Sequence, residues 1–160
     1  CVDIDKDLKA VSEDLFLEEK LGPKKSFEAI EARAFLNQTK KKYDLIILDL
    51  YRDPVSAPEY LITREFFQQV KDHLKDGGIM TGNYFSSPNF SDIFSVRLDN
   101  TMRSVFPNLN RQVVKPYNAW EREDDWTNIN YSYVHRPDVS DVIYTDDKNW
   151  SLFDKPAKVH

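Results

Sequence analysis

The stretch Tyr43-Asp44-Leu45-Ile46-Ile47-Leu48-Asp49-Leu50 decides the fold class of this chain. Its apolar residues form a continuous run and do not alternate with polar ones. Such a run is typical of a strand that is buried on both faces, as in a parallel sheet that carries helices on each side. The stretch therefore predicts an α/β fold built around a helix-covered, mostly parallel sheet.

Strand and helix signals alternate on both sides of this strand, which supports the same fold class. The elements predicted before it are the end of a buried strand at residues 1–5, a helix with Leu8, Val11 and Leu15 on its apolar face, a short strand at 26–30, and a short helix at 32–39 with Phe35 and Leu36 inward. After it, the sequence predicts a helix that is capped by Thr63, has Phe66, Val70 and Leu74 on one face and is closed by Gly77-Gly78. A strand at 79–85 follows, and then a helix that begins at Ser91 or Asp92 and has Phe94, Leu98, Met102 and Val105 on one face. Two further strands are predicted at 112–115 and 129–134. The last two strands predict a closing antiparallel hairpin.

Composition and charge exclude several classes of function. The 160 residues fit one domain, because domains cluster near ~100–150 residues. A formal charge of −5 disfavours a nucleic-acid groove, which needs a basic stripe, and suits a cationic small molecule. The single cysteine, Cys1, and three scattered histidines predict neither a disulfide framework nor a histidine-based metal site. No apolar run approaches the ~20 residues of a membrane span, and no signal peptide is visible, so we expect a cytoplasmic protein without a membrane partner.

Carboxylates stand at the ends of three predicted strands, and this is the main chemical signal in the sequence. In open parallel sheets, ligands bind beyond the carboxyl ends of the strands. A carboxylate there can accept hydrogen bonds from two ribose hydroxyls, which Asp3 or Asp5 could do, and Glu31 could accept from an adenine amino group. Asp49 would lie closer to a reacting centre, since an ionised residue after a buried apolar run has to be satisfied there. The alternative is that these residues only cap helices.

The ordered set of these segments resembles the polyamine aminopropyltransferases, the spermidine and spermine synthase family. The matching stretches, which keep good register from residue 1 to about residue 106, are Val2-Asp3-Ile4-Asp5, Glu31-Ala32-Arg33-Ala34-Phe35-Leu36, Tyr43 to Asp49, Leu61-Ile62-Thr63-Arg64-Glu65-Phe66-Phe67, and Val70 to Gly78. The resemblance implies a Rossmann-like class I methyltransferase fold over residues 1–136, with residues 137–160 as a carboxyl-terminal extension of the same domain. It also implies a transferase that moves an aminopropyl group from decarboxylated S-adenosylmethionine to a polyamine acceptor, without a metal and in a homo-oligomer.

The resemblance assigns roles to individual residues. Asp3, with Asp5 beside it, matches the acidic position that holds the donor's ribose, and Glu31 with Ala32 matches the pair beside the adenine. Asp49 matches the aspartate that accepts a proton from the attacking amine. The candidates for holding the rest of the cationic amine, through carboxylate or aromatic faces, are Tyr51, Asp53, Tyr84 and Tyr117. For each of these four, a surface or packing role is the alternative.

The sequence departs from the family pattern in ways that indicate a divergent member. The family normally shows Asp-Ser-Ser-Asp-Pro after the fourth strand, whereas this chain has Asp49-Leu50-Tyr51-Arg52-Asp53-Pro54. Thr81-Gly82-Asn83 replaces a glutamine-centred segment, and Tyr144-Thr145-Asp146-Asp147 is similar to a late segment of synthase-like members. Two other functions therefore stay open, an S-adenosylmethionine-dependent methyltransferase and a non-catalytic binding domain of the same fold.

The first strand and glycine-rich loop of this fold are missing from the sequence, since all four glycines lie elsewhere. The fold consequently requires a strand between the strands at residues 1–5 and 43–50, and the chain does not supply this strand. We expect a neighbouring chain, direct pairing of the flanking strands, or sequence outside the chain to close the gap, because unpaired ladder groups are costly. By the same reasoning, we expect the chain alone to be inactive.

Overall fold

The computed structural model of the chain describes residues 1–51, 57–114, 126–132 and 146–147. The described residues belong to two units, residues 1–41 and residues 42–160, called here the first and the second unit. The positions of the units relative to each other are not determined, so each is described by itself. No helix in the described ranges is long and apolar enough to span a membrane.

The first unit is built from short elements. Strand β1 (Val2–Asp3) pairs in parallel with β2 (Glu28–Ala29). Between them lie α1 (Leu8–Val11) and η1 (Ser12–Phe16), a single turn of π-helix, and α2 (Ala32–Gln38) follows β2. The two strands and α2 confirm the predicted strand–helix order in this part of the chain.

The helical segment of the first unit does not bury the apolar face predicted for it. Val11 is 39% exposed and Leu15 is 71% exposed, so the prediction of a packed Leu8, Val11 and Leu15 face is wrong for these two residues. The one buried side chain is that of Glu13, which accepts a hydrogen bond from the Leu21 backbone N–H. That hydrogen bond is the main cause that lowers the pKa of Glu13. The segment is therefore held by the polar contacts of Glu13 and not by packing of its apolar side chains.

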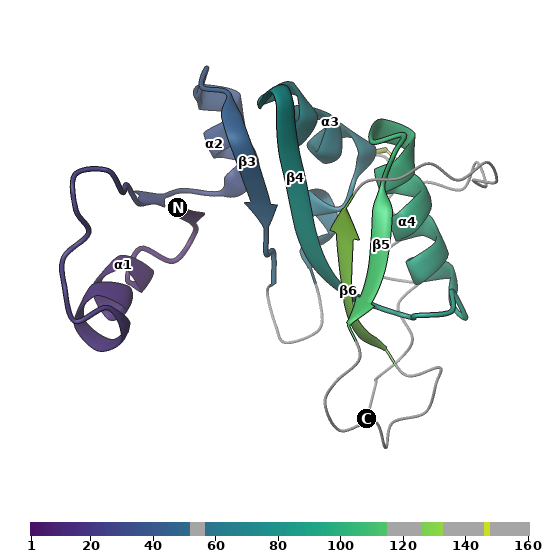
Figure 1. Ribbon diagram of the computed structural model, residues 1–160, viewed down its shortest axis with the longest axis horizontal. Helices are drawn as coiled ribbons and strands as arrows, with labels where there is room; N and C mark the ends of the chain where they lie inside the picture. The colour runs from purple at the N-terminus through teal and green to yellow at the C-terminus, as the bar shows by residue number, and fades with distance from the viewer. Residues whose placement is uncertain (52–56, 115–125, 133–145, 148–160) are drawn as a thin grey trace. The chain divides into compact units, whose positions relative to one another are not determined.

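The second unit holds a four-stranded mixed sheet in the order β3-β4-β6-β5 (Figure 1). Its elements are β3 (Tyr43–Leu48), η2 (Glu59–Leu61), α3 (Arg64–Asp72), β4 (Leu74–Ser86), α4 (Ile93–Val105), β5 (Asn110–Val114) and β6 (Thr127–Ser132). Strands β3 and β4 are parallel, and β4–β6 and β5–β6 are antiparallel. The predicted α/β class with a closing antiparallel hairpin is confirmed.

Helices α3 and α4 cover one face of this sheet and form the core with it. The side chain of Thr63 accepts from the Phe66 N–H and that of Asp92 accepts from the Ser95 N–H, so both helices begin at the predicted caps. The buried helix residues include Phe66, Val70, Phe94, Leu98, Met102 and Val105, as their spacing predicted. An aromatic series joins the layers, because Phe67 meets Tyr84 edge-on at 6.4 Å and Tyr84 meets Tyr131 at 6.0 Å.

Helix α3 ends earlier than predicted. It ends at Asp72, and Gly77-Gly78, expected to close it, lie within β4. There the register with β3 shifts from Tyr43↔Leu74 to Leu45↔Ile79. Gly77 adopts a φ of 75°, and a Cβ on Gly78 would lie 2.9 Å from the carbonyl oxygens of Lys75 and Tyr43. The glycine pair therefore permits a bulge in a strand and does not form a helix cap.

Strand β3 is not buried on both faces, so that prediction is wrong for the described structure. Leu48 faces the helices and is 5% exposed, whereas Leu45 and Ile47 on the opposite face are 51% and 67% exposed. Helices α3 and α4 cover only one face, and no described element of the second unit covers the other. The apolar run shows that the strand is rich in apolar residues, but it does not show whether helices cover one face of the strand or both.

Strands β1 and β3, which the sequence places beside a missing strand, belong to different sheets. Direct pairing of the flanking strands is therefore not found among the described residues. A neighbouring chain and sequence outside this chain remain predictions.

Candidate active site

Asp49 follows directly after β3, at the carboxyl end of the parallel β3–β4 pair. Its side chain is exposed, so water can solvate it and no buried partner is required. This differs from the expectation that a carboxylate after a buried run must be satisfied inside the protein. An exposed carboxylate at this edge of the sheet is accessible to a soluble ligand.

Tyr51 lies two residues farther along and turns back onto β4. Strand β3 pairs with β4 as far as Leu48↔Gly82, whereas β4 continues to Ser86. Beyond Gly82, the Tyr51 hydroxyl donates a hydrogen bond to the Asn83 backbone carbonyl oxygen, with 3.2 Å between the oxygens. Burial and then the negative charge of Asp49 raise the pKa of Tyr51 to about 12, and a hydrogen bond from the Phe85 backbone opposes the rise. The structure thus brings Tyr51, Asp49 and the β4 edge together.

Tyr84 lies in the core beneath this edge. It is 2% exposed, and its ring packs between those of Phe67 and Tyr131. Burial raises the pKa of Tyr84, so its hydroxyl stays protonated. This position favours the packing role that was the alternative for Tyr84. The other two amine-binding candidates, Asp53 and Tyr117, lie outside the described residues.

The candidate donor-binding residues of the first unit are engaged by their own backbone. Asp3 Oδ1 accepts from the Asp5 N–H at 2.8 Å, and Asp5 Oδ1 accepts from the Asp7 N–H at 2.9 Å. The Glu31 carboxylate caps α2 by accepting from the Arg33 and Ala34 N–H groups, both at 2.9 Å, and Ala32 is the first residue of that helix. The capping alternative is confirmed for Glu31, whereas Asp3 and Asp5 accept from backbone N–H groups ahead of α1 and cap no helix. A carboxylate has about four lone-pair sites, however, so each retains capacity for a ligand donor.

Asn83 is a polar residue at the sheet edge, and the sequence distinguishes it only as part of the segment Thr81-Gly82-Asn83, which departs from the family pattern. Its side-chain oxygen is buried and has no hydrogen-bond partner among the described residues. It shares the open face of the sheet with Thr81 and Phe85, because side chains alternate along β4. Its position one residue beyond the last β3–β4 pair depends on the strand register, so no signal in the sequence identifies it.

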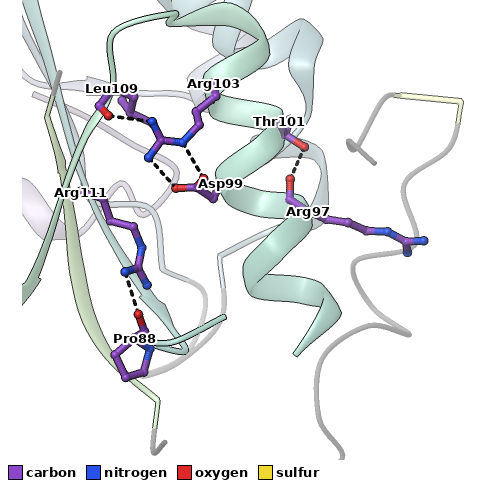
Figure 2. A network of polar contacts seen from close by, with 7 residues as sticks. All are labelled: Pro88, Arg97, Asp99, Thr101, Arg103, Leu109 and Arg111. Atoms are coloured by element: carbon purple, nitrogen blue, oxygen red, sulfur yellow. Dashed lines mark hydrogen bonds and ion pairs between the residues drawn. The ribbon is translucent and has the colours of Figure 1, made fainter. Parts of the chain in front are cut away.

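The segment after β4 is held by side chains from the hairpin and from α4. Arg111 of β5 donates to the carbonyl oxygens of Ser87 and Pro88 at 2.6 and 2.8 Å and lies over the ring of Phe90 at 4.2 Å. Figure 2 shows Arg111 reaching Pro88 beside a second arginine, Arg103. The carboxyl end of β4 is therefore fixed by contacts within the second unit.

Arg103 of α4 forms an ion pair with Asp99, with both side chains less than a tenth exposed. The Nε–Oδ2 distance is 2.6 Å, and Nη1 donates to the Leu109 carbonyl oxygen at 2.9 Å (Figure 2). Asp99 holds the Arg103 guanidinium within α4, and the hydrogen bond from Arg103 to Leu109 connects this helix to the residue before β5.

The arrangement can supply a carboxylate, a phenol and amide oxygens at one sheet edge of the second unit. Such groups accept hydrogen bonds from ammonium and amine groups, and the carboxylate can take a proton. In the described ranges, no group of three or more His, Cys, Asp or Glu side chains could hold a metal ion.

Comparison with known proteins connects these features to one family. The family model "Spermine/spermidine synthase domain" matches residues 1–117. A probable polyamine aminopropyl transferase of Bifidobacterium longum is 33% identical over 93 residues, which cover 58% of this chain and 21% of that protein. A polyamine aminopropyltransferase of Saccharolobus solfataricus is 43% identical over 75 residues, which cover 45% of this chain and 24% of that protein. The matched part thus spans no more than about a quarter of these relatives.

Solved structures support the fold. A probable spermidine synthase from Corynebacterium glutamicum superposes with a TM-score of 0.65 at 19% identity, covering 83% of this chain and 46% of that one. Human methyltransferase-like protein 13, in complex with SAH, gives a TM-score of 0.66 at 18% identity and covers 86% of this chain and 60% of that one. The chain therefore has the fold that spermidine synthases and class I methyltransferases share.

Proposed function

The chain belongs to the spermine/spermidine synthase domain family, and on that premise we propose that it is part of an enzyme that transfers an aminopropyl group to a polyamine acceptor. The observation that carries the proposal is the family match over residues 1–117, which includes Asp49 at the carboxyl end of β3. The curated relatives bear the name polyamine aminopropyltransferase. The net charge of −5 is favourable for attracting a polycation.

The donor in this proposal is decarboxylated S-adenosylmethionine. Asp3 and Asp5 would accept from its ribose hydroxyls, and Glu31 with Ala32 would lie beside the adenine. The lone pairs that the local backbone contacts leave free fit this role, because hydroxyl and amino groups are donors. No metal is required, since the sulfonium of the donor is already a good leaving group.

The acceptor reaction would depend on Asp49. The amine nitrogen attacks the carbon of the aminopropyl group that is bonded to sulfur, the C–S bond breaks, and its electron pair leaves with neutral methylthioadenosine. Because an ammonium is not a nucleophile, the acceptor nitrogen first loses a proton, which Asp49 would accept, and the product leaves as a secondary ammonium. General-base groups of this kind contribute ~10²–10⁴ in rate. Tyr51, Asp53 and Tyr117 remain proposed contacts for the rest of the acceptor, whereas the buried ring of Tyr84 would act through packing.

Asp49→Asn tests the assignment of the proton acceptor. In the full-length protein, we expect kcat for aminopropyl transfer to fall by ~10²–10⁴ while binding of the donor is retained. Asp44→Asn is the matched control, since this 84% exposed carboxylate lies at the opposite end of β3. Equal activity of Asp49→Asn and wild type would contradict the role of Asp49.

Calorimetric titration tests the donor class. We expect decarboxylated S-adenosylmethionine and methylthioadenosine to bind more tightly than S-adenosylmethionine. Preference for S-adenosylmethionine would replace the proposal by methyl transfer, and binding of none of the three would favour a non-catalytic domain.

A homo-oligomer and a cytoplasmic location are further predictions from the family. Size-exclusion chromatography with light scattering would check the first, and cell fractionation would check the second.

A further inference from the structure

Strand β4 extends beyond its parallel neighbour. Its pairing with β3 ends at Gly82, and the next four residues continue to Ser86 while paired on their other side with β6. Backbone groups alternate in direction along a strand, so those of Gly82, Tyr84 and Ser86 point one way and those of Asn83 and Phe85 the other. An edge of this kind presents unpaired N–H and C=O groups.

The side chain of Tyr51 meets this part of the edge. Its hydroxyl donates to the Asn83 carbonyl oxygen at 3.2 Å, and the Phe85 backbone is near enough to act on the pKa of the same phenol. The hydroxyl therefore satisfies the Asn83 carbonyl, a group that a longer β3 would otherwise pair. The Tyr51 side chain is partly buried, which is consistent with a place beside β4.

We propose that Tyr51 is a positioning residue whose hydroxyl fastens the segment carrying Asp49 to the edge of β4. Asp49 is two residues from this attachment and follows the last residue of β3, so its backbone is held on both sides. A base held in one place needs no reorganisation to meet the amine, and small displacements of such groups are costly in rate. The inference rests on the proposed function, and for Tyr51 it replaces the contact with the acceptor by a positioning role.

The charge around Tyr51 is consistent with this geometry. Asp49 is close enough for its negative charge to raise the pKa of the phenol, and burial raises it further, to about 12. The hydroxyl therefore keeps its proton at neutral pH and remains a hydrogen-bond donor to Asn83.

Tyr51→Phe tests the attachment, because it removes the hydroxyl and retains the ring. In the full-length protein, we expect kcat to fall about fivefold, the effect of one ordinary hydrogen bond, while KM for the polyamine changes less than twofold. Tyr43→Phe, at the other end of β3, is the matched control and should leave both constants unchanged. A rise in KM with unchanged kcat would make Tyr51 a direct contact of the acceptor and overturn the proposal.

Amide hydrogen exchange provides a readout that does not depend on activity. Because the Tyr51 side chain is attached to this stretch of the β4 edge and lies close to the Phe85 backbone, we expect Tyr51→Phe to accelerate exchange of the Phe85 amide about fivefold or more, and Tyr43→Phe to leave it unchanged. Unchanged Phe85 exchange in Tyr51→Phe would overturn the attachment. If the wild type shows no aminopropyl transfer, the proposed function fails, and the exchange result still decides whether the attachment exists.

Discussion

The two units of the chain place their candidate functional groups by different means. In the first unit, Asp3, Asp5 and Glu31 are held by hydrogen bonds to backbone groups two or three residues away. In the second unit, Asp49 follows a strand of a sheet that packs on two helices.

Burial separates the units in the same way. Every buried hydrophobic side chain of the described residues lies in the second unit. Both units expose large hydrophobic side chains, and those of the first unit are Ile4, Val11, Leu15, Phe16 and Leu17. Local polar contacts can therefore shape a ligand-binding loop without a core, whereas fixing a group beside a sheet edge depends on long-range packing.

The largest expected effect concerns the aromatic core of the second unit. Phe67→Ala removes a fully buried ring that contacts Tyr84 and Phe106, and we expect a loss of about 3–5 kcal/mol in the free energy of unfolding. Phe16→Ala in the first unit removes a ring that is 79% exposed, and it should change stability by no more than ~0.5 kcal/mol. Denaturant titration followed by circular dichroism would measure both. Similar losses in the two variants would show that Phe16 is buried in solution and would break the contrast.

The second effect concerns ion pairs. Asp99→Asn leaves the Arg103 guanidinium, 7% exposed, without its carboxylate, and we expect a loss of about 3 kcal/mol because an uncompensated buried charge remains. In the first unit, Lys25 and Glu19 are more than half exposed and 3.9 Å apart, so Glu19→Gln should leave the unfolding midpoint within experimental error. The same denaturant titration, repeated at high salt, checks the comparison. A stable Asp99→Asn variant would mean that the pair does not support the β5–β6 hairpin.

The sequence predicts the elements of the second unit well, because their signals are local. Caps at Thr63 and Asp92 and the spacing of Phe94, Leu98 and Met102 depend on contacts within a few turns, and the structure confirms them. Gly77-Gly78 misled the prediction, since a glycine with positive φ serves a strand bulge as well as a helix cap, and only the register with β3 distinguishes the two.

Burial and the candidate site were less predictable because they depend on distant partners. The run Leu45 to Leu48 has the same composition whether helices cover one face or both, so the exposure of Ile47 could not be inferred from it. Asp49 could be placed at the end of a strand from the sequence alone. The contact of Tyr51 with Asn83 could not be predicted from the sequence, because it spans 32 residues and depends on how far β4 extends beyond the end of β3.

The smallest expected effect compares two helix caps. Thr63→Ala removes the hydrogen bond to the Phe66 N–H in the packed unit, and we expect a loss of ~1 kcal/mol in global stability. Glu31→Ala removes the hydrogen bonds to Arg33 and Ala34, but α2 contains no buried residue, so its ordering contributes little to the global transition. We therefore expect faster amide exchange confined to α2, with the global unfolding midpoint unchanged.

If Glu31→Ala instead lowered the global midpoint as much as Thr63→Ala, α2 would unfold together with the core of the second unit. The carboxylate at Glu31 would then be held by long-range packing, like Asp49, and the distinction between the two units would fail at the residue where it matters most for donor binding.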